Sequence, residues 1–168
     1  MLSRIEDCIP ALRRYALALL RDRQDADDLV HDCLVRALDK LHMCRDGVDV
    51  RGWLFTIMHN LFISQRRRAK ARPDAAALEE NEEEGSHGAP ADQEDQLQWK
   101  ELLRVLNSLA EDQRTVILLV SVEDLSYAEA ARVLGVPIGT VMSRLARGRE
   151  RMRQLTQEKG RLPLRRVK

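Results

Sequence analysis

Residues 126–153 read SYAEAARVLGVPIGTVMSRLARGRERMR, and this stretch decides the fold of the C-terminal part of the chain. Ser126 is placed to cap a short helix, because Glu129 follows three residues later and completes a capping box. Apolar side chains then recur at helical spacing, at Tyr127, Ala130, Ala131 and Leu134. Gly135 supplies the permissive backbone that ends the helix. The stretch therefore predicts a helix-turn-helix.

The second helix of this motif has a basic outer face. Its inward positions after the turn are apolar, at Val141, Leu145, Met152 and Leu155. Its outward positions carry hydroxyl and guanidinium groups that suit base edges and phosphates in a DNA groove: Thr140, Ser143, Arg144, Arg147 and Arg151. The alternative is an ordinary corner between two bundle helices with a solvated basic face. Turn chemistry and charge together favour DNA binding.

Charge is strongly segregated along the chain. The net charge over 168 residues is only +1, yet residues 73–96 hold nine acidic residues and no Lys or Arg. The remainder therefore has 28 basic and 18 acidic residues, a net charge of +10. Because residues 73–96 also contain two prolines and two glycines, they are predicted to form a flexible acidic linker. We expect one domain at residues 1–72, a second at 97–159 and a basic tail at 160–168.

Residues 1–72 are predicted to be entirely helical. A first helix is lined by Ile9, Leu12, Ala16, Leu19 and Leu20. A second, capped by Asp25, has the clearest apolar face of the chain, at Ala26, Leu29, Val30, Cys33, Leu34, Ala37, Leu38 and Leu41. Its opposite face is mostly charged and includes Asp28, Asp32, Val35 and Arg36. Such a face is either merely solvated or a docking surface for a basic partner.

A third helix is predicted from Arg51 to about Lys70. Its core-facing side chains are Leu54, Ile57, Met58, Leu61 and Phe62. On or near its exposed side lie Phe55, His59, Asn60, Arg66 and Arg67. Aromatic and amide groups beside arginines suit single-stranded nucleic acid, whose bases stack and whose phosphates pair with cations. Because no strand pattern occurs, the predicted fold is all-α: two small helical domains joined by a flexible acidic linker, the C-terminal one a helix-turn-helix.

The composition disfavours several classes of protein. No apolar run approaches the length of a bilayer span and no signal-peptide pattern opens the chain, so we expect no membrane insertion and a cytoplasmic location. Cys8, Cys33 and Cys44 are odd in number and lack a CxxC spacing, which argues against a disulfide framework or a zinc ribbon. His31 with Cys33, and His42 with Cys44, could suggest a metal site, but residues two apart point to different helix faces. We expect no metal, no cofactor and no enzymatic activity.

Three segments in their order resemble a known family. They read DADDLVHDCLVRAL at 25–38, RGWLFTIMHNLFISQRRR at 51–68 and, after the acidic linker, LAEDQRTVILLVSVEDLSYAEAARVLGVPIGTVMSRLARGRERM at 109–152. Together they resemble the extracytoplasmic-function (group four) sigma factors of bacterial RNA polymerase, over nearly the whole chain. The segment FTIMHNLF at 55–62 is similar to the corresponding segment in the branch of the family that serves the alphaproteobacterial general stress response. This similarity implies a role in a stress response.

The resemblance implies a role for each domain. In the family, the first domain binds the clamp helices of the largest polymerase subunit and melts the minus-ten element. The second reads the minus-thirty-five element and packs on the flap of the other large subunit. By matching motifs, polymerase binding falls to Asp28, Asp32, Val35 and Arg36. Contact with the melted element falls to Asp46 and Gly47, in a loop that would hold a flipped base, and to His59, Asn60, Arg66 and Arg67.

Two positions depart from the family pattern. Met142 stands where many members have Lys, which removes a possible DNA contact. Gly148 stands where many have Ala, and is expected to weaken the recognition helix by up to about 1 kcal/mol.

The implied partners are core RNA polymerase, through both large subunits, promoter DNA and an anti-sigma factor. We expect the anti-sigma factor to be mostly helical and wedged between the domains, over residues 28–36 and the surface near residues 117–122. The acidic linker is either a mimic of RNA in the polymerase channel or a plain tether. A stand-alone helix-turn-helix regulator and a serine recombinase are the alternatives. The first domain of such a regulator is more often a receiver or ligand domain with strands, and the recombinase needs an N-terminal α/β catalytic domain with an active Ser.

Overall fold

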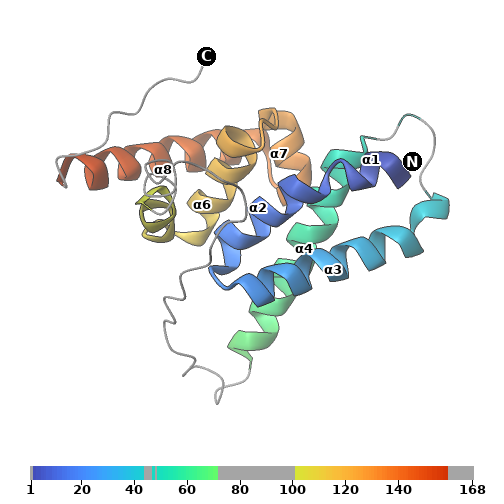
Figure 1. The fold of residues 1–168 in the computed structure, drawn as a ribbon. Helices are drawn as coiled ribbons and strands as arrows, with labels where there is room; N and C mark the ends of the chain where they lie inside the picture. The colour runs from blue at the N-terminus through green and yellow to red at the C-terminus, as the bar shows by residue number, and fades with distance from the viewer. Residues whose placement is uncertain (1, 44–46, 48, 72–100, 159–168) are drawn as a thin grey trace.

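The computed structural model describes residues 2–43, 47, 49–71 and 101–158. The predicted linker at 73–96, the tail at 160–168 and Asp46 lie outside the described residues. All regular secondary structure within the described ranges is helical, as Figure 1 shows, which confirms the all-α prediction.

Four α-helices make up the N-terminal lobe, which we define as residues 2–71. They are α1 (Leu2–Glu6), α2 (Ile9–Leu20), α3 (Arg23–Asp39) and α4 (Val50–Lys70), with a short 3-10 helix η1 (Leu41–Met43) after α3. Helix α3 packs against both α2 and α4. The core between these three helices includes four side chains with no exposed surface: Leu12, Leu29, Cys33 and Leu54.

Helix α3 begins earlier than the sequence pattern predicted. Its N-cap is Asp22, whose side-chain oxygen accepts a hydrogen bond from the Asp25 backbone N–H at 2.8 Å. The predicted cap, Asp25, therefore lies within the first turn. There burial, with Asp22 and Asp28 nearby, raises the pKa of the Asp25 carboxyl.

The C-terminal lobe, which we define as residues 101–158, is built around the predicted helix-turn-helix. It contains a helical segment at 101–107, α6 (Glu111–Ile117), a π-helical turn η3 (Leu118–Val122), α7 (Tyr127–Leu134) and α8 (Ile138–Glu158). Helix α8 packs on α6 and α7. Val141 and Leu145 are buried as predicted, and Met152 and Leu155 pack at the edge of the core.

The two lobes pack directly on each other, a contact that the sequence did not predict. Helix α4 contacts α7, and α2 contacts η3; Figure 1 shows α7 beside α4 at this junction. Buried side chains of both lobes join in one hydrophobic cluster.

Three side chains lie on a face other than the predicted one. Phe55 is fully buried, and its ring meets that of Tyr15 of α2 edge-on at 5.3 Å. Leu38 is 50% exposed in the last turn of α3, since the helix ends one residue later. Tyr127 is exposed at the first position of α7. Val133, which was not on the predicted apolar stripe, is buried instead.

Neither a membrane span nor a metal cluster is found in the part of the chain that the structure describes. No described helix is both long enough and apolar enough to cross a bilayer. The described His, Cys, Asp and Glu residues form no group of three that could hold a metal ion.

Candidate nucleic-acid interface

The first helix of the helix-turn-helix, α7, is fixed at both ends by local interactions. The Ser126 hydroxyl oxygen accepts the Glu129 backbone N–H at 3.2 Å, and the Glu129 carboxylate accepts the Ser126 backbone N–H at 2.8 Å. The Ser126 hydroxyl also donates to the Glu129 carboxylate at 2.6 Å, and this bond, together with the one from the Ser126 backbone N–H, lowers the pKa of Glu129. At the other end of α7, Gly135 takes the left-handed conformation, with φ of 63°. Both predicted signals, the capping box and the terminating glycine, are therefore confirmed.

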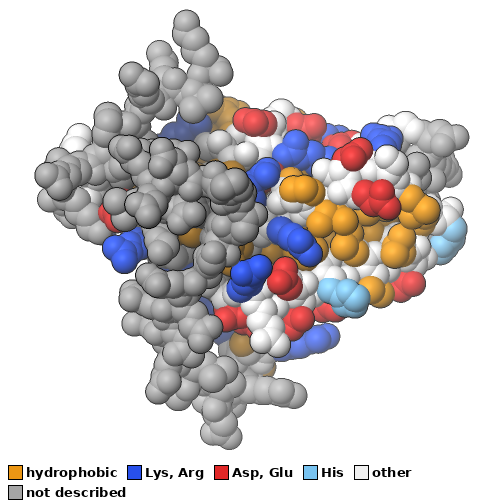
Figure 2. Space-filling view, in the orientation of Figure 1, with side chains coloured by type: hydrophobic (Ala, Val, Ile, Leu, Met, Phe, Trp, Pro, Cys, Tyr) orange, Lys and Arg blue, Asp and Glu red, His pale blue; other side chains and the backbone are white. Residues whose placement is uncertain are grey.

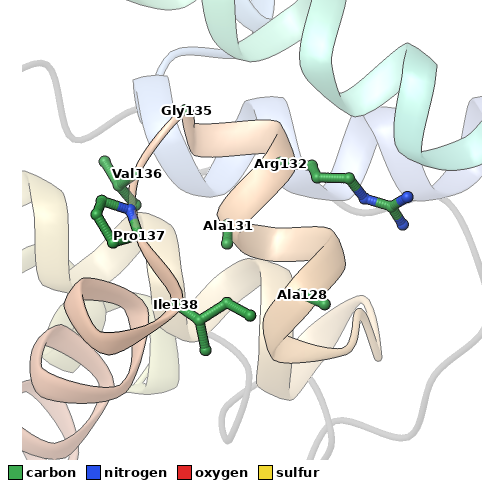
Figure 3. A pocket seen from close by; sticks show the side chains of 7 residues that line it. All are labelled: Ala128, Ala131, Arg132, Gly135, Val136, Pro137 and Ile138. Carbon is green, nitrogen blue, oxygen red and sulfur yellow. The ribbon is translucent and has the colours of Figure 1, made fainter.

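The turn leaves an open groove between α7 and the start of α8. Its lining residues are Ala128, Ala131, Arg132, Gly135, Val136, Pro137 and Ile138. Figure 3 shows Ile138 at the start of α8 facing Ala128 across the groove, while the Arg132 side chain extends away from the turn. Ile138 and Met142 are both about half exposed, so the beginning of α8 presents apolar as well as basic groups to solvent.

The five predicted upstream-element residues differ in their availability. Ser143, Arg147 and Arg151 are exposed along α8, whereas Thr140 is partly buried. Arg144 is held against its own lobe, because its Nε lies 3.2 Å from the Asp112 carboxylate and its side chain is only 27% exposed. Arg147 donates from Nε to the Ser143 carbonyl oxygen at 3.3 Å within the helix. Of the three predicted arginines on this helix, Arg147 and Arg151 are thus accessible and Arg144 is not.

Gly148 has a packing role that the sequence did not reveal. A Cβ at this position would lie 2.7 Å from Ile117 Cδ1 and 3.3 Å from Gln113 Cβ, both on α6. The missing side chain therefore allows α8 to approach α6 closely. The expectation that Gly148 only weakens the recognition helix is incomplete for this reason.

One face of α4 carries residues at spacings of four and seven, which places them in a single stripe. Arg51, Phe55, His59 and Arg66 lie on this stripe, which we call the α4 inner stripe. Arg66 donates from Nε to the Glu111 carboxylate at 2.9 Å.

His59, on this stripe, lies among charges of the C-terminal lobe. Burial lowers its pKa to about 4, with Glu111 opposing and Arg144 adding to the shift.

The remaining predicted strand-contacting residues are accessible. Asn60 and Arg67 are exposed on α4, beside the inner stripe. Gly47 is exposed in the loop before α4 and has φ of 91°, a left-handed conformation that glycine adopts without strain. Gly47, Asn60 and Arg67 are thus exposed to solvent, whereas His59 and Arg66 lie against the C-terminal lobe.

The four predicted polymerase-binding residues are all exposed on α3: Asp28, Asp32, Val35 and Arg36. Leu38 extends this surface, and Leu2 of α1 is exposed as well. Figure 2 shows hydrophobic side chains gathered between α1, α2 and α3, with charged side chains around them. An apolar patch with a charged rim is typical of a protein-binding surface. The helical spacing of the apolar residues predicted Leu38 to lie in the core, so the sequence did not predict that Leu38 belongs to this exposed surface.

The described cysteines are buried thiols. Cys33 donates its S–H to the Leu54 carbonyl oxygen at 3.5 Å, and burial raises its pKa to about 12. Burial likewise raises the pKa of Cys8. Both are therefore protonated and unreactive at neutral pH. Cys44 lies outside the described residues, so the structure does not test its proximity to His42.

Comparison with known proteins identifies relatives of both lobes. Residues 99–152 match the family model of Sigma-70, region 4, and residues 5–59 match that of the Sigma2 domain of PhyR. The chain is 34% identical over 148 residues to the ECF RNA polymerase sigma factor EcfG of Rhodopseudomonas palustris, covering 88% of this chain and 80% of that protein. It is 35% identical over 144 residues to the ECF RNA polymerase sigma factor SigM of Mycobacterium tuberculosis, covering 86% of this chain and 70% of that protein.

Solved structures show the same similarity. The sigma factor RpoE in complex with the anti-sigma factor NepR, from Bartonella quintana, matches with a TM-score of 0.76 and 33% identity, covering 92% of this chain and 95% of that one. CnrH in complex with the cytosolic domain of CnrY shares the fold, with a TM-score of 0.69 and 24% identity over 93% of this chain and 86% of that one.

Proposed function

Because the chain belongs to the extracytoplasmic-function family of RNA polymerase sigma factors, we propose that it binds core RNA polymerase and directs promoter-specific initiation of transcription. The observation that carries this proposal is the presence, in one chain, of a capped helix-turn-helix and a separate exposed surface on α3. A DNA-reading helix alone would suit any regulator. The second surface suits a subunit that must also hold a large partner.

We assign the two tasks to different parts of the chain. Residues 1–72 would bind the polymerase clamp through Asp28, Asp32, Val35 and Arg36, and residues 97–159 would read the upstream element through α8. Duplex DNA admits an inserted helix, so Ser143, Arg147 and Arg151 suit base edges and phosphates there. Arg144 would join them once it is released from Asp112, and Thr140 would contribute at the start of the helix.

The melted element needs a different surface, because its bases are unstacked. Asn60, Arg67 and Gly47 are exposed at one side of α4 and in the loop before it, which supports a strand-binding role. His59 and Arg66 would complete this surface. Asp46, outside the described residues, would contribute from the same loop.

Regulation and location follow from the family. The relative RpoE was solved in complex with an anti-sigma factor, NepR, which supports control of this chain by an anti-sigma factor, with a role in a stress response. We place its action in the cytoplasm, where RNA polymerase works, and expect it to have no catalysis of its own. On the predicted surface near residues 117–122, an anti-sigma factor could reach Val120, Ser121 and Val122, whereas Ile117, Leu118 and Leu119 are buried.

Charge reversal on α3 tests the docking surface. Asp32→Lys is expected to weaken binding to core polymerase by about fivefold or more, on the order of 1 kcal/mol, because it removes charge complementarity at the proposed contact. Asp7→Lys makes the same charge change in the exposed turn between α1 and α2, outside the four predicted docking residues, and serves as the control. Circular dichroism should show equal helicity in both variants.

Unchanged affinity of Asp32→Lys for core polymerase in a fluorescence titration would contradict the docking assignment. Tight binding of the free chain to duplex promoter DNA, with no dependence on polymerase, would favour the stand-alone regulator instead.

A further inference from the structure

The start of α8, the second helix of the helix-turn-helix, exposes two large apolar side chains. Ile138, its first residue, is 47% exposed, and Met142, about one turn later, is 52% exposed. Side chains four residues apart on a helix are neighbours, so the two form one apolar pair. Figure 3 shows Ile138 at the beginning of α8, facing Ala128 of α7 across the open groove. The pair therefore lies at the end of α8 that directly follows the turn.

Polar groups are scarce in the same part of the helix. The first six residues of α8, 138–143, carry no charge. Thr140 is partly buried, and the Ser143 hydroxyl donates to the Thr140 carbonyl oxygen at 3.0 Å, so its proton is used inside the helix. Gly139 has no side chain. The two large side chains that this segment exposes are therefore both apolar.

The basic groups of α8 begin farther along the helix. Arg144, the first of them, has its Nε 3.2 Å from the Asp112 carboxylate. Arg147 and Arg151, in the following turns, are exposed. Contacts of such arginines with phosphates fix the position of a helix on the duplex, whatever bases stand opposite its start. The helix thus has an apolar start that can discriminate between bases and a basic continuation that can hold the backbone.

The major groove offers such a pair one kind of partner. In a helix-turn-helix, the N-terminal residues of the second helix contact base edges in that groove. Thymine alone among the four standard bases presents an apolar group there, its C5-methyl group. Apolar side chains set against a donor or acceptor would remove it from water without replacing its hydrogen bonds, which is unfavourable. An apolar start of α8 therefore favours thymine over the other three bases.

We propose that Met142, supported by Ile138, contacts the C5-methyl group of a thymine in the upstream element and determines the base preference at that position. Met142 is the more exposed of the two, and its unbranched thioether side chain adapts to the shape of its partner. Ile138 extends the apolar surface toward the groove beside α7. Met142 then supplies an apolar contact with DNA, where the sequence pattern had suggested only the loss of a polar one. The proposal rests on the proposed function, in which α8 reads the upstream element.

The test compares thymine with uracil, which differ only in the C5-methyl group. Labelled duplex promoter fragments, recovered by mapping start sites with core polymerase, carry deoxyuridine in place of one upstream-element thymine at a time. They are titrated with the full chain bound to core polymerase. We expect binding to weaken about fourfold at one or two positions, the effect of leaving one methyl group unburied. Deoxyuridine between the upstream and downstream elements is the control and should change nothing.

Variants assign the effect to the side chain. Met142→Ala should bind the thymine and uracil fragments equally at the sensitive position. Met142→Lys has a side chain of similar length with a charge at its end, so it should also lose the discrimination and should steepen the salt dependence by about one ion. Arg147→Ala is the matched control on the same helix, because it should weaken binding to both fragments and keep the fourfold ratio between them. Thermal unfolding checks that the variants fold.

The outcomes separate this proposal from the proposed function. Equal affinity of the wild type for thymine and uracil at every upstream position would overturn the proposal alone, as would an upstream element without an A·T pair. Unchanged discrimination in Met142→Ala would overturn it as well. Absence of any start site that depends on the chain would overturn the proposed function, and this proposal with it.

A methyl group of the same chemistry occurs on 5-methylcytosine. Fragments that carry 5-methylcytosine in place of an upstream-element cytosine distinguish the two sources. Unchanged affinity for these fragments, together with the thymine effect, supports the contact with thymine. A gain in affinity from 5-methylcytosine, with no effect of deoxyuridine, would assign the contact to methylated cytosine and overturn the assignment to thymine.

Discussion

His59 shows how the environment of one residue couples stability to pH. Its pKa is lowered to about 4 by burial, so the folded chain holds it neutral at pH 7. In the unfolded chain the imidazole takes up a proton near pH 6.5, its ordinary value. Stability from this residue is therefore complete above pH 6.5 and falls as the pH drops toward 4.

The expected loss from His59 is on the order of 2 kcal/mol between pH 7 and pH 5. His59→Gln should remove that part of the pH dependence, because glutamine does not titrate. The measurement is urea unfolding of wild type and variant at both pH values. His31→Gln, which changes an exposed histidine on α3, is the control. Equal pH dependence in wild type and His59→Gln would contradict the buried, neutral state.

Gly148 of α8 determines how closely α8 can approach α6. An added methyl group would meet Ile117, which is buried, and Gln113. Overpacking costs about 1–3 kcal/mol, and alanine returns about 1 kcal/mol of helix propensity. We therefore expect Gly148→Ala to destabilise the chain by about 1 kcal/mol in thermal unfolding.

Gly139 is the matched control on the same helix. A Cβ there meets nothing within 4 Å, so Gly139→Ala should stabilise the chain by up to about 1 kcal/mol. A higher melting temperature for Gly148→Ala than for wild type would show that α6 and α8 have room between them.

The elements were predictable where local chemistry determines them. The capping box at Ser126, the glycine after α7 and the extent of α4 follow from residues adjacent in sequence. The start of α3 was not predictable, because Asp22 and Asp25 are both competent caps and only the packing selects between them. The π-helical turn before Glu123 has no local signal, since no residue type in LLVSV requires it.

At the scale of the whole molecule, the contact between the lobes could not be read from the sequence. The α4 inner stripe carries Arg51, His59 and Arg66, which periodicity assigns to solvent. These residues lie against the C-terminal lobe because Glu123 and Glu111, far along the chain, accept hydrogen bonds from Arg51 and Arg66. Of the predicted site, the α3 surface is exposed as expected, and so are Ser143, Arg147 and Arg151 of α8. Thr140 and Arg144 of α8 and the melted-strand surface are partly covered.

The central claim is that this chain makes core RNA polymerase select promoters. Transcription in vitro with core polymerase on a library of genomic fragments, followed by mapping of start sites, tests it most directly. We expect a small set of start sites that share an upstream and a downstream element and are absent with core polymerase alone. Arg147→Ala, which changes an exposed side chain of α8, should weaken use of these sites by about 1–3 kcal/mol and relax one upstream position. Start sites identical to those of core polymerase alone would contradict the claim.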